Sequence, residues 1–260
     1  MKRKGEKDEE EEKEGEIVKK KEESGERSST TRVSYREDID GLRGVAVLSV
    51  ILFHFCKSLL PGGFTGVDVF FVISGFLITS NILKEMKAGK FSFSEFYSRR
   101  VKRIFPASAF CILLVLVYSW LVFFPSKFGE TAQSGMWGLL SSSNFYNAFN
   151  IKTGYFGDDI STMPLMHLWS LAVEEQFYMI WPILMLFLSK KDNKLSTALV
   201  FALILGSTLG GEIVYYKSVS LAYYMLPTRM GEMMVGSLLA FHKPELNRMW
   251  KEVGLLVWYS

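Results

Sequence analysis

Successive apolar segments, each about twenty residues long, constrain the fold of this chain more than any other feature. They cover roughly residues 39–60, 66–86, 104–124, 168–188, 195–216 and 221–241. A helix needs about 20 apolar residues to cross a hydrocarbon core about 30 Å thick. A helix also pairs its own backbone groups, which lipid cannot do. The sequence therefore predicts an all-α fold, a polytopic bundle of transmembrane helices.

Two further segments are less regular. Residues 131–149 mix Gly, Ser and Asn with apolar residues, so they either span the membrane or lie re-entrant against other helices. A last apolar segment begins near Val253 and has about eight residues before Ser260, fewer than a span requires. We therefore expect the chain to stop within a helix, as a C-terminally truncated sequence.

The N-terminal segment differs from the rest of the chain in composition. Residues 1–35 hold ten Lys or Arg and eleven Asp or Glu residues, with few large apolar side chains. Such a segment cannot bury enough apolar surface to offset the entropy lost on ordering. We predict a disordered Lys/Glu-rich cytoplasmic tail at residues 1–34, followed by a transmembrane domain at residues 35–260 that is incomplete at its C-terminus.

Charge and cysteine content limit the partners. Six basic residues and one acid lie between Lys87 and Arg103, whereas the loop between the first two segments has only Lys57. Basic loops favour the cytoplasm, so we place the N-terminus and residues 87–103 there, in a membrane that the sequence does not identify. The net charge of +3 indicates no nucleic-acid partner. With two cysteines and no His/Cys cluster at ligand spacing, we expect neither a disulfide framework nor a metal site.

Arg43 and His54 are ionisable residues within the first apolar segment. Eleven helical steps of about 100° bring them within about 20° of one face, about 16 Å apart along the axis. Such a pair within a membrane helix indicates a functional site. A neutral imidazole can take a proton from a hydroxyl, as acyl transfer to an alcohol requires, or accept an acyl group transiently. The alternative is a hydrogen bond between helices.

His167 and Glu174 mark the start of the segment at 168–188. Their seven-residue spacing places them within about 20° of each other on a helix. Glu174 could orient a histidine, act as an acid or base, or hold Arg43 in place. The alternative is an acidic helix start at the membrane interface.

Two arginine-containing groups complete the set. Arg100 and Arg103 lie one turn apart on the predicted cytoplasmic side, where guanidinium groups could bind the phosphates of coenzyme A or anchor the chain to anionic lipid. Arg229 and Glu232 have i,i+3 spacing, which allows either a structural ion pair or a substrate contact.

Five sequence blocks in this order resemble the acyltransferase 3 family of integral membrane O-acyltransferases, which includes O-antigen and peptidoglycan acetylases. The matching residues are the pair Arg43 and His54, and the blocks Gly66–Ile78, Arg100–Pro106, His167–Tyr178 and Pro227–Glu232. Within these blocks the motif residues are Asp68, Ser74, His167, Trp169, Ser170, Glu174, Arg229 and Glu232. The His167–Tyr178 block makes Glu174, rather than Glu175, the motif glutamate.

The resemblance implies a multi-helix enzyme that uses acyl-CoA as a co-substrate and no cofactor. It assigns His54 as catalytic base or acyl relay oriented by Arg43, Glu174 as a second catalytic group, and Arg100 and Arg103 to acyl-CoA binding. The acceptor would be a hydroxyl of a carbohydrate or lipid-linked molecule on the far side of the membrane. Together with the Lys/Glu tail, the resemblance suggests an invertebrate member.

Our hypothesis is a membrane-bound acyltransferase, transferring an acyl group other than amino-acyl, most simply acetyl, with O-acetylation as the outcome. The alternatives are a non-catalytic membrane protein that binds or transports lipids or small hydrophobic molecules, and an inactive fragment. Formation of a product that depends on acyl-CoA would separate the first hypothesis from the second.

Overall fold

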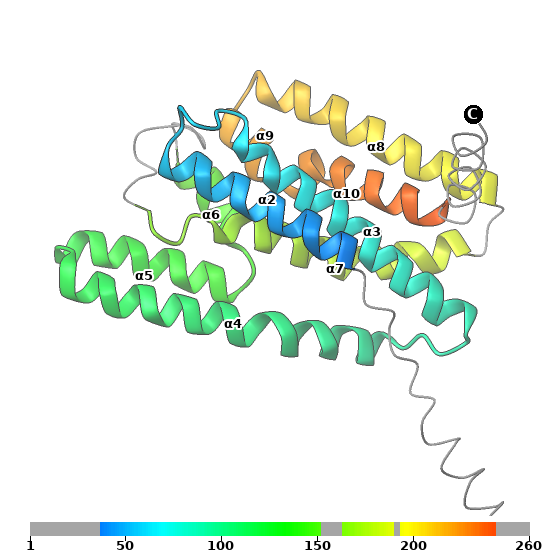
Figure 1. Cartoon of the computed structure of the whole chain (residues 1–260), viewed down its shortest axis with the longest axis horizontal. Coiled ribbons are helices and arrows are strands. Elements are labelled where there is room, and N and C mark those ends of the chain that lie inside the picture. The colour runs from blue at the N-terminus through cyan, green and yellow to red at the C-terminus, as the bar shows by residue number, and fades with distance from the viewer. Residues whose placement is uncertain (1–36, 152–162, 190–192, 243–260) are drawn as a thin grey trace, which may run out of the picture. The chain divides into compact units, whose positions relative to one another are not determined.

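The computed structural model describes residues 37–151, 163–189 and 193–242. The predicted tail at 1–34 and the segment that begins near Val253 lie outside these residues. The described residues form helices and contain no strand, which confirms the all-α prediction (Figure 1). The elements are α2 (Glu37–Phe55), the 3-10 turn η1 (Gly63–Thr65), α3 (Gly66–Lys87), α4 (Phe93–Val122), α5 (Pro125–Leu139), α6 (Ser143–Asn150), α7 (Leu168–Ser189), α8 (Asn193–Tyr215), α9 (Val219–Tyr224) and α10 (Leu226–Phe241).

Within the described residues, four helical stretches are long and apolar enough to cross a membrane: residues 63–87, 93–122, 168–188 and 194–215. Three of them match the predicted segments 66–86, 168–188 and 195–216. The fourth, α4, begins eleven residues before the predicted start at 104 and includes the basic residues up to Arg103. The protein is therefore a multi-pass membrane protein whose basic segment forms the first turns of a spanning helix.

Two predicted apolar segments are not single helices. The segment 221–241 was predicted to be continuous, and this is wrong: an extended residue, Met225, separates α9 from α10. Pro227 in the first turn of α10 explains the break, because proline starts a helix well but cannot donate a backbone hydrogen bond within one. Residues 131–149 are divided between α5 and α6 by a turn in which Ser141 has a φ of 52°.

Helices α3 and α10 pack closely because each helix places a glycine against the backbone of the other. A Cβ atom at Gly75 would collide with the backbone oxygen of Met233, and one at Gly236 with that of Val72. Small residues at such contacts let two membrane helices approach, which dispersion forces then stabilise. One turn after Gly75, the hydroxyl of Thr79 donates a hydrogen bond to the hydroxyl of Ser237 (2.9 Å). The same Thr79 hydroxyl accepts a hydrogen bond from the indole N–H of Trp181 in α7 (2.7 Å).

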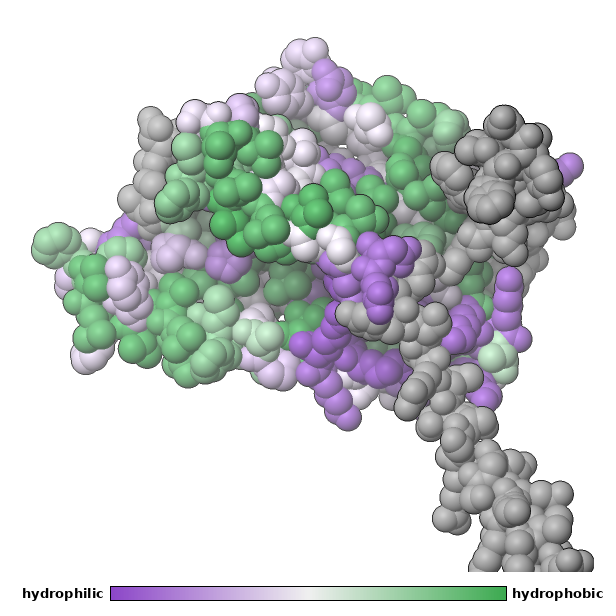
Figure 2. Space-filling model, viewed as in Figure 1, coloured by the Kyte–Doolittle hydropathy of each residue, from purple (hydrophilic) through white to green (hydrophobic). Residues whose placement is uncertain are grey.

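Burial separates central helices from peripheral ones. Half of the apolar window of residues 63–87 and 44% of that in α7 are buried in protein, against 11% in α4 and in α8. The uncovered side of α4 carries Phe110, Leu114, Trp120 and Leu121, and Figure 2 shows a hydrophobic surface along much of this helix. Helices α3 and α7 therefore form the centre, and α4 and α8 present apolar faces suited to lipid.

Contacts between α7 and α4 show how these two helices are oriented relative to each other. The buried Ile112 in α4 packs with Leu165 and Leu168 at the start of α7, and Arg100, three turns earlier in α4, lies over the ring of Tyr178. Helices α4 and α7 are therefore antiparallel. Helix α2 lies against η1 and the start of α3, since Cβ atoms at Gly63 and Gly66 would collide with Ser49 and Ala46.

Candidate active site

Glu174, in the second turn of α7, lies at the centre of one polar group. Its carboxylate accepts hydrogen bonds from the hydroxyl of Ser74 in α3 (2.6 Å) and from that of Tyr178, one turn further along α7 (3.4 Å). The positive charges of Arg43 and Arg100 both act on this carboxylate. Three other helices, α2, α3 and α4, thus contribute to the surroundings of one acidic group.

Arg100 is the half-buried member of the predicted donor-binding pair. Its guanidinium lies between two aromatic rings, 5.7 Å from the centre of Phe96 and 5.5 Å from that of Tyr178. Cation–π contacts of this kind stabilise a cation that has lost part of its water. Arg103, one turn along α4, is exposed to solvent, and its charge acts on Arg100. The pair therefore consists of one arginine directed into the protein and one at its surface.

His54 lies at the end of α2, where its ring is held by its own helix. Its Nδ1 lies 2.8 Å from the backbone oxygen of Val50, and its ring packs edge-to-face against Phe53. A carbonyl oxygen only accepts, so Nδ1 carries the hydrogen, and in the neutral ring Nε2 then holds the lone pair. Since about 16 Å of helix axis separates Arg43 from His54, Val50 rather than Arg43 orients the imidazole directly.

His167 precedes α7 and lies near His54. Its ring donates a hydrogen bond to the backbone oxygen of Pro164. Burial lowers the pKa of His167 below its ordinary value of 6.5, and the charge of His54 lowers the pKa further. The neutral ring therefore predominates at pH 7. Ser170, in the first turn of α7, donates to the backbone oxygen of His167 at 3.2 Å.

Arg229 in α10 forms the centre of a second polar group. Its guanidinium pairs with Asp68 in α3 and, at 3.0 Å, with Glu232 in α10. The rings of Phe71, Trp169 and Tyr223 surround it at 5.1 to 5.9 Å. The i,i+3 ion pair predicted between Arg229 and Glu232 is therefore present, and it is one of two ion pairs that Arg229 makes in a group joining α3 and α10.

Glu175, next to the motif glutamate, belongs to a different contact. Its carboxylate accepts a hydrogen bond from Ser141, in the turn between α5 and α6. The adjacent Gln176 donates to Asn144 at 2.8 Å and to the backbone oxygen of Ser141 at 3.1 Å. Glu174 and Glu175 thus point in different directions, Glu174 toward α3 and Glu175 toward the turn between α5 and α6. Among the described residues, no group of three His, Cys, Asp or Glu side chains is placed to hold a metal ion.

Two functional contacts escaped the sequence reasoning. Tyr178 contacts both Glu174 and Arg100, and its four-residue spacing from Glu174 could have indicated the first of these contacts. The pairing of Asp68 with Arg229 joins residues 161 positions apart, and no spacing within a helix signals it.

Comparisons with known proteins agree with the order of these motifs. The profile of a family described as an acyltransferase domain, acyltransferase 3, matches residues 36–259. An O-acetyltransferase, OatA, of Staphylococcus aureus is 38% identical over 218 residues, which cover 81% of this chain and 35% of the relative. A peptidoglycan O-acetyltransferase, OatA, of Listeria monocytogenes is 38% identical over 227 residues, which cover 85% of this chain and 36% of the relative.

The chain thus spans about a third of the length of these curated relatives. No solved structure matches it. Because the family profile covers residues 36–259 of the 260-residue chain, the chain belongs to the acyltransferase 3 family of membrane proteins.

Proposed function

We propose that this chain is the membrane part of an O-acyltransferase that moves an acetyl group from acyl-CoA to a hydroxyl of a carbohydrate or lipid-linked acceptor across the membrane. Its family membership supports the acyl-transfer chemistry. The names of its relatives as O-acetyltransferases, one of them a peptidoglycan O-acetyltransferase, support acetyl as the group and a glycan as the acceptor.

The observation that carries the proposal is the pairing of α2 with the start of α7. Arg43 acts on Glu174, and His54, eleven residues later, acts on His167, seven residues earlier. The two helices therefore run in opposite directions, with Arg43 acting on Glu174 at one level and His54 acting on His167 at the other. At about 1.5 Å per residue, the residues of the two levels are about 16 Å apart along α2 and about 10 Å apart along α7.

His54, at the level of the two imidazoles, is the proton acceptor for acyl transfer. The acceptor oxygen attacks the carbonyl carbon of the thioester while Nε2 of His54 takes the proton of the hydroxyl. The C–S bond then breaks, and the proton passes to the departing thiolate, which yields an ester and free coenzyme A. His167, neutral at pH 7, adds no competing positive charge beside His54.

The level that contains Arg43 and Glu174 is the one nearer the predicted cytoplasmic side. Arg100 and the exposed Arg103 lie in the basic first turns of α4, and the rings of Phe96 and Tyr178 hold the Arg100 side chain in place. Guanidinium groups bind phosphate oxygens through two parallel hydrogen bonds. These residues suit the phosphates of acyl-CoA, and the Arg43–Glu174 level would lie between the donor and the imidazoles.

Labelled acetyl-CoA tests the proposal. Membranes that contain the chain, supplied with [14C]acetyl-CoA and a glycan acceptor, should form an alkali-labile labelled product and release coenzyme A in equal amount. Matched membranes without the chain should form neither. If the inserted chain moves lipid or hydrophobic molecules but neither labels acceptor nor releases coenzyme A, the acyltransferase proposal is wrong and the transport alternative stands.

A further inference from the structure

Tyr178, near the middle of α7, contacts two of the groups proposed for the reaction. The centre of its ring lies 5.5 Å from the guanidinium carbon of Arg100 in α4. Its hydroxyl donates a hydrogen bond of 3.4 Å to the carboxylate of Glu174. The side chain is only 8% exposed, so both contacts are made inside the protein. One buried side chain therefore joins the arginine proposed for the donor to the carboxylate proposed for catalysis.

The ring contact leaves the hydrogen-bonding groups of Arg100 available to a ligand. In the described part of the chain, its guanidinium is held by the rings of Phe96 and Tyr178 and hydrogen-bonds no carboxylate. A guanidinium carries its N–H donors in one plane, and a ring over its face uses none of them. The donors that the rings leave unused suit the phosphate oxygens of acyl-CoA.

Arg229 shows the other way in which this protein holds an arginine. It also lies among aromatic rings, but its guanidinium pairs with the carboxylates of Asp68 and Glu232. Its donors are thus used to join two helices of the protein. Arg100 has ring contacts without such a carboxylate among the described residues, which is the arrangement that binding of an external anion requires.

The backbone of α7 is also held by α4 next to Tyr178. The hydroxyl of Tyr97 in α4 donates to the backbone oxygen of Met179 at 2.8 Å. Pro182, four residues after Tyr178, has no N–H group with which to bond the Tyr178 oxygen, so the helix is less self-supporting here. Tyr97 and Arg100 are three residues apart and share a face of α4. Contacts between the same two helices therefore fix both the ring and the guanidinium.

The ring contact should matter more than the hydroxyl contact for donor binding. Hydrogen bonds from a hydroxyl to a carboxylate are normally about 2.5–2.7 Å long, and Ser74 makes one of 2.6 Å to the same Glu174 carboxylate. The bond from Tyr178, at 3.4 Å, is longer and therefore weaker. A cation–π contact, by contrast, is strongest where the cation has lost water, as at the half-buried Arg100.

We propose that Tyr178 is a positioning residue for the donor, whose ring orients Arg100 toward the phosphates of acyl-CoA and whose hydroxyl steadies Glu174. This inference rests on the proposed function for its part in catalysis, but binding of coenzyme A can be measured without transfer.

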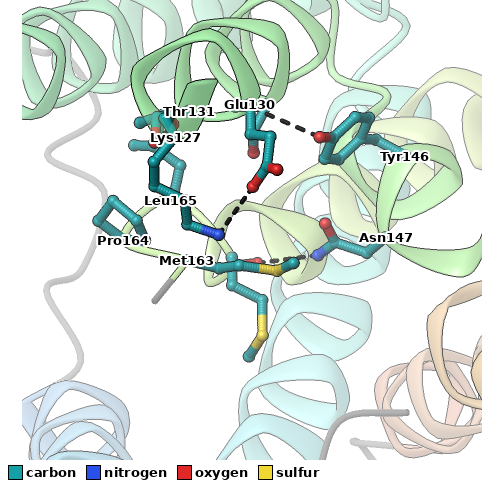
Figure 3. Close-up of a pocket in the computed structure, with 10 residues that line it drawn as sticks. Lys127, Glu130, Thr131, Tyr146, Asn147, Met163, Pro164 and Leu165 are labelled. Atoms are coloured by element: carbon teal, nitrogen blue, oxygen red, sulfur yellow. Dashed lines mark hydrogen bonds and ion pairs between the residues drawn. The ribbon is translucent and has the colours of Figure 1, made fainter. Parts of the chain in front are cut away.

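Calorimetric titration of coenzyme A into the purified chain in detergent tests the ring contact. Tyr178→Leu removes the ring, and Tyr178→Phe keeps the ring and removes only the hydroxyl. The matched control is Tyr146→Leu, because Tyr146 is also 8% exposed and its hydroxyl lies 3.5 Å from the backbone oxygen of Glu130 rather than beside an arginine (Figure 3). If Tyr178→Leu does not fold, Tyr178→Met takes its place.

We expect Tyr178→Leu to raise the Kd for coenzyme A about five- to tenfold, as loss of a desolvated cation–π contact would. Tyr178→Phe and Tyr146→Leu should bind as the wild type does. In an Arg100→Met background, Tyr178→Leu should cause no further loss, because the two changes remove the same contact. Equal losses in Tyr178→Leu and Tyr146→Leu, additive losses in the double variant, or no binding of coenzyme A by the wild type would each overturn the inference.

Acetyl transfer separates the two proposals. Tyr178→Phe should lower kcat about threefold, since the hydrogen bond that it loses is long, and leave the KM for acetyl-CoA unchanged. An unchanged kcat would overturn the part assigned to the hydroxyl. Coenzyme A binding in the expected pattern without any transfer by the wild type would reject the proposed function alone. Transfer by the wild type with an unchanged Kd in Tyr178→Leu would reject the role of Tyr178 alone.

Discussion

The hydroxyl of Ser74 in α3 donates a hydrogen bond of 2.6 Å to the carboxylate of Glu174 in α7. The two residues are 100 positions apart, and each belongs to a different sequence block of the family. The contact joins two central helices at the level where Arg43 and Arg100 also act on Glu174. In the proposed mechanism, Ser74 is therefore a positioning residue for this carboxylate.

Replacing Ser74 with alanine should reduce acetyl transfer without unfolding the protein. A hydrogen bond to a charged group contributes about 1.5–3 kcal/mol, so we expect kcat/KM to fall about 10- to 100-fold. Ser80→Ala is the control, because the buried hydroxyl of Ser80, on the same helix, has no hydrogen-bond partner in the described part of the chain. Equal losses in the two variants would show that Ser74 does not act through Glu174.

Removing Arg229 should destabilise the protein strongly. Its side chain is 14% exposed and pairs with the carboxylates of Asp68 and Glu232, which are 36% and 27% exposed, and loss of one partner of a fully buried ion pair costs about 3–5 kcal/mol, which is an upper bound here. We expect Arg229→Met to lower the apparent midpoint of thermal unfolding in detergent by many degrees.

The matched change is Arg99→Met, which breaks an ion pair with Glu85 in which Arg99 is 51% exposed. Exposed pairs contribute about 0–1 kcal/mol, so its unfolding midpoint should stay near that of the wild type. Similar midpoints for the two variants would contradict a buried, structural role for the group around Arg229.

Protonation of His167 should weaken the fold as pH falls. Burial and the charge of His54 hold its pKa in the folded state below the ordinary value of 6.5. Below pH 6.5 the unfolded chain therefore binds more protons at this residue, and stability decreases with falling pH until the folded-state pKa is passed. His167→Gln should remove this part of the pH dependence. Identical slopes of the unfolding midpoint from pH 7 to pH 5 in the two proteins would show that the folded state does not lower the pKa of His167.

The donor arginines should affect acetyl-CoA and not the acceptor. Arg100→Met combined with Arg103→Met removes two guanidinium groups at the start of α4, so we expect the KM for acetyl-CoA to rise at least tenfold with an unchanged acceptor KM. Lys87→Met with Lys90→Met removes the same charge from exposed positions nearby and should change neither constant. An equal rise in both double variants would indicate a general charge effect on the donor.

The sequence predicted the membrane helices where the apolar run was long and uninterrupted. Residues 66–86, 168–188 and 195–216 agree with the structure, because about 20 apolar residues leave a helix as the main option in lipid. It did not predict the break at Met225, since hydropathy averages over the proline that starts α10. It placed Arg100 and Arg103 one helical turn apart, but it did not predict that the helix begins as early as Phe93.

The candidate site shows a similar division. Spacing along one helix correctly related Arg229 to Glu232, because residues three apart are neighbours on a helix. Contacts between helices, such as Asp68 with Arg229, depend on packing that no local pattern encodes. A small pocket lined by Lys127, Glu130, Tyr146 and Asn147 (Figure 3) had no sequence signal, because its residues come from separate parts of the chain and carry no motif. The cytoplasmic N-terminus, the acyl-CoA donor and the invertebrate origin stay predictions.

One comparison of two histidines tests the central claim most directly. His54 and His242 each have Nδ1 within 3.1 Å of a backbone oxygen four residues earlier, near the end of a helix. Transfer of [14C]acetyl from acetyl-CoA to a glycan should therefore be measured for His54→Gln and His242→Gln at equal amounts of inserted protein. The proposed mechanism predicts that His54→Gln abolishes transfer and His242→Gln retains it. Retained transfer in His54→Gln would contradict the assignment of His54 as the group that accepts the proton.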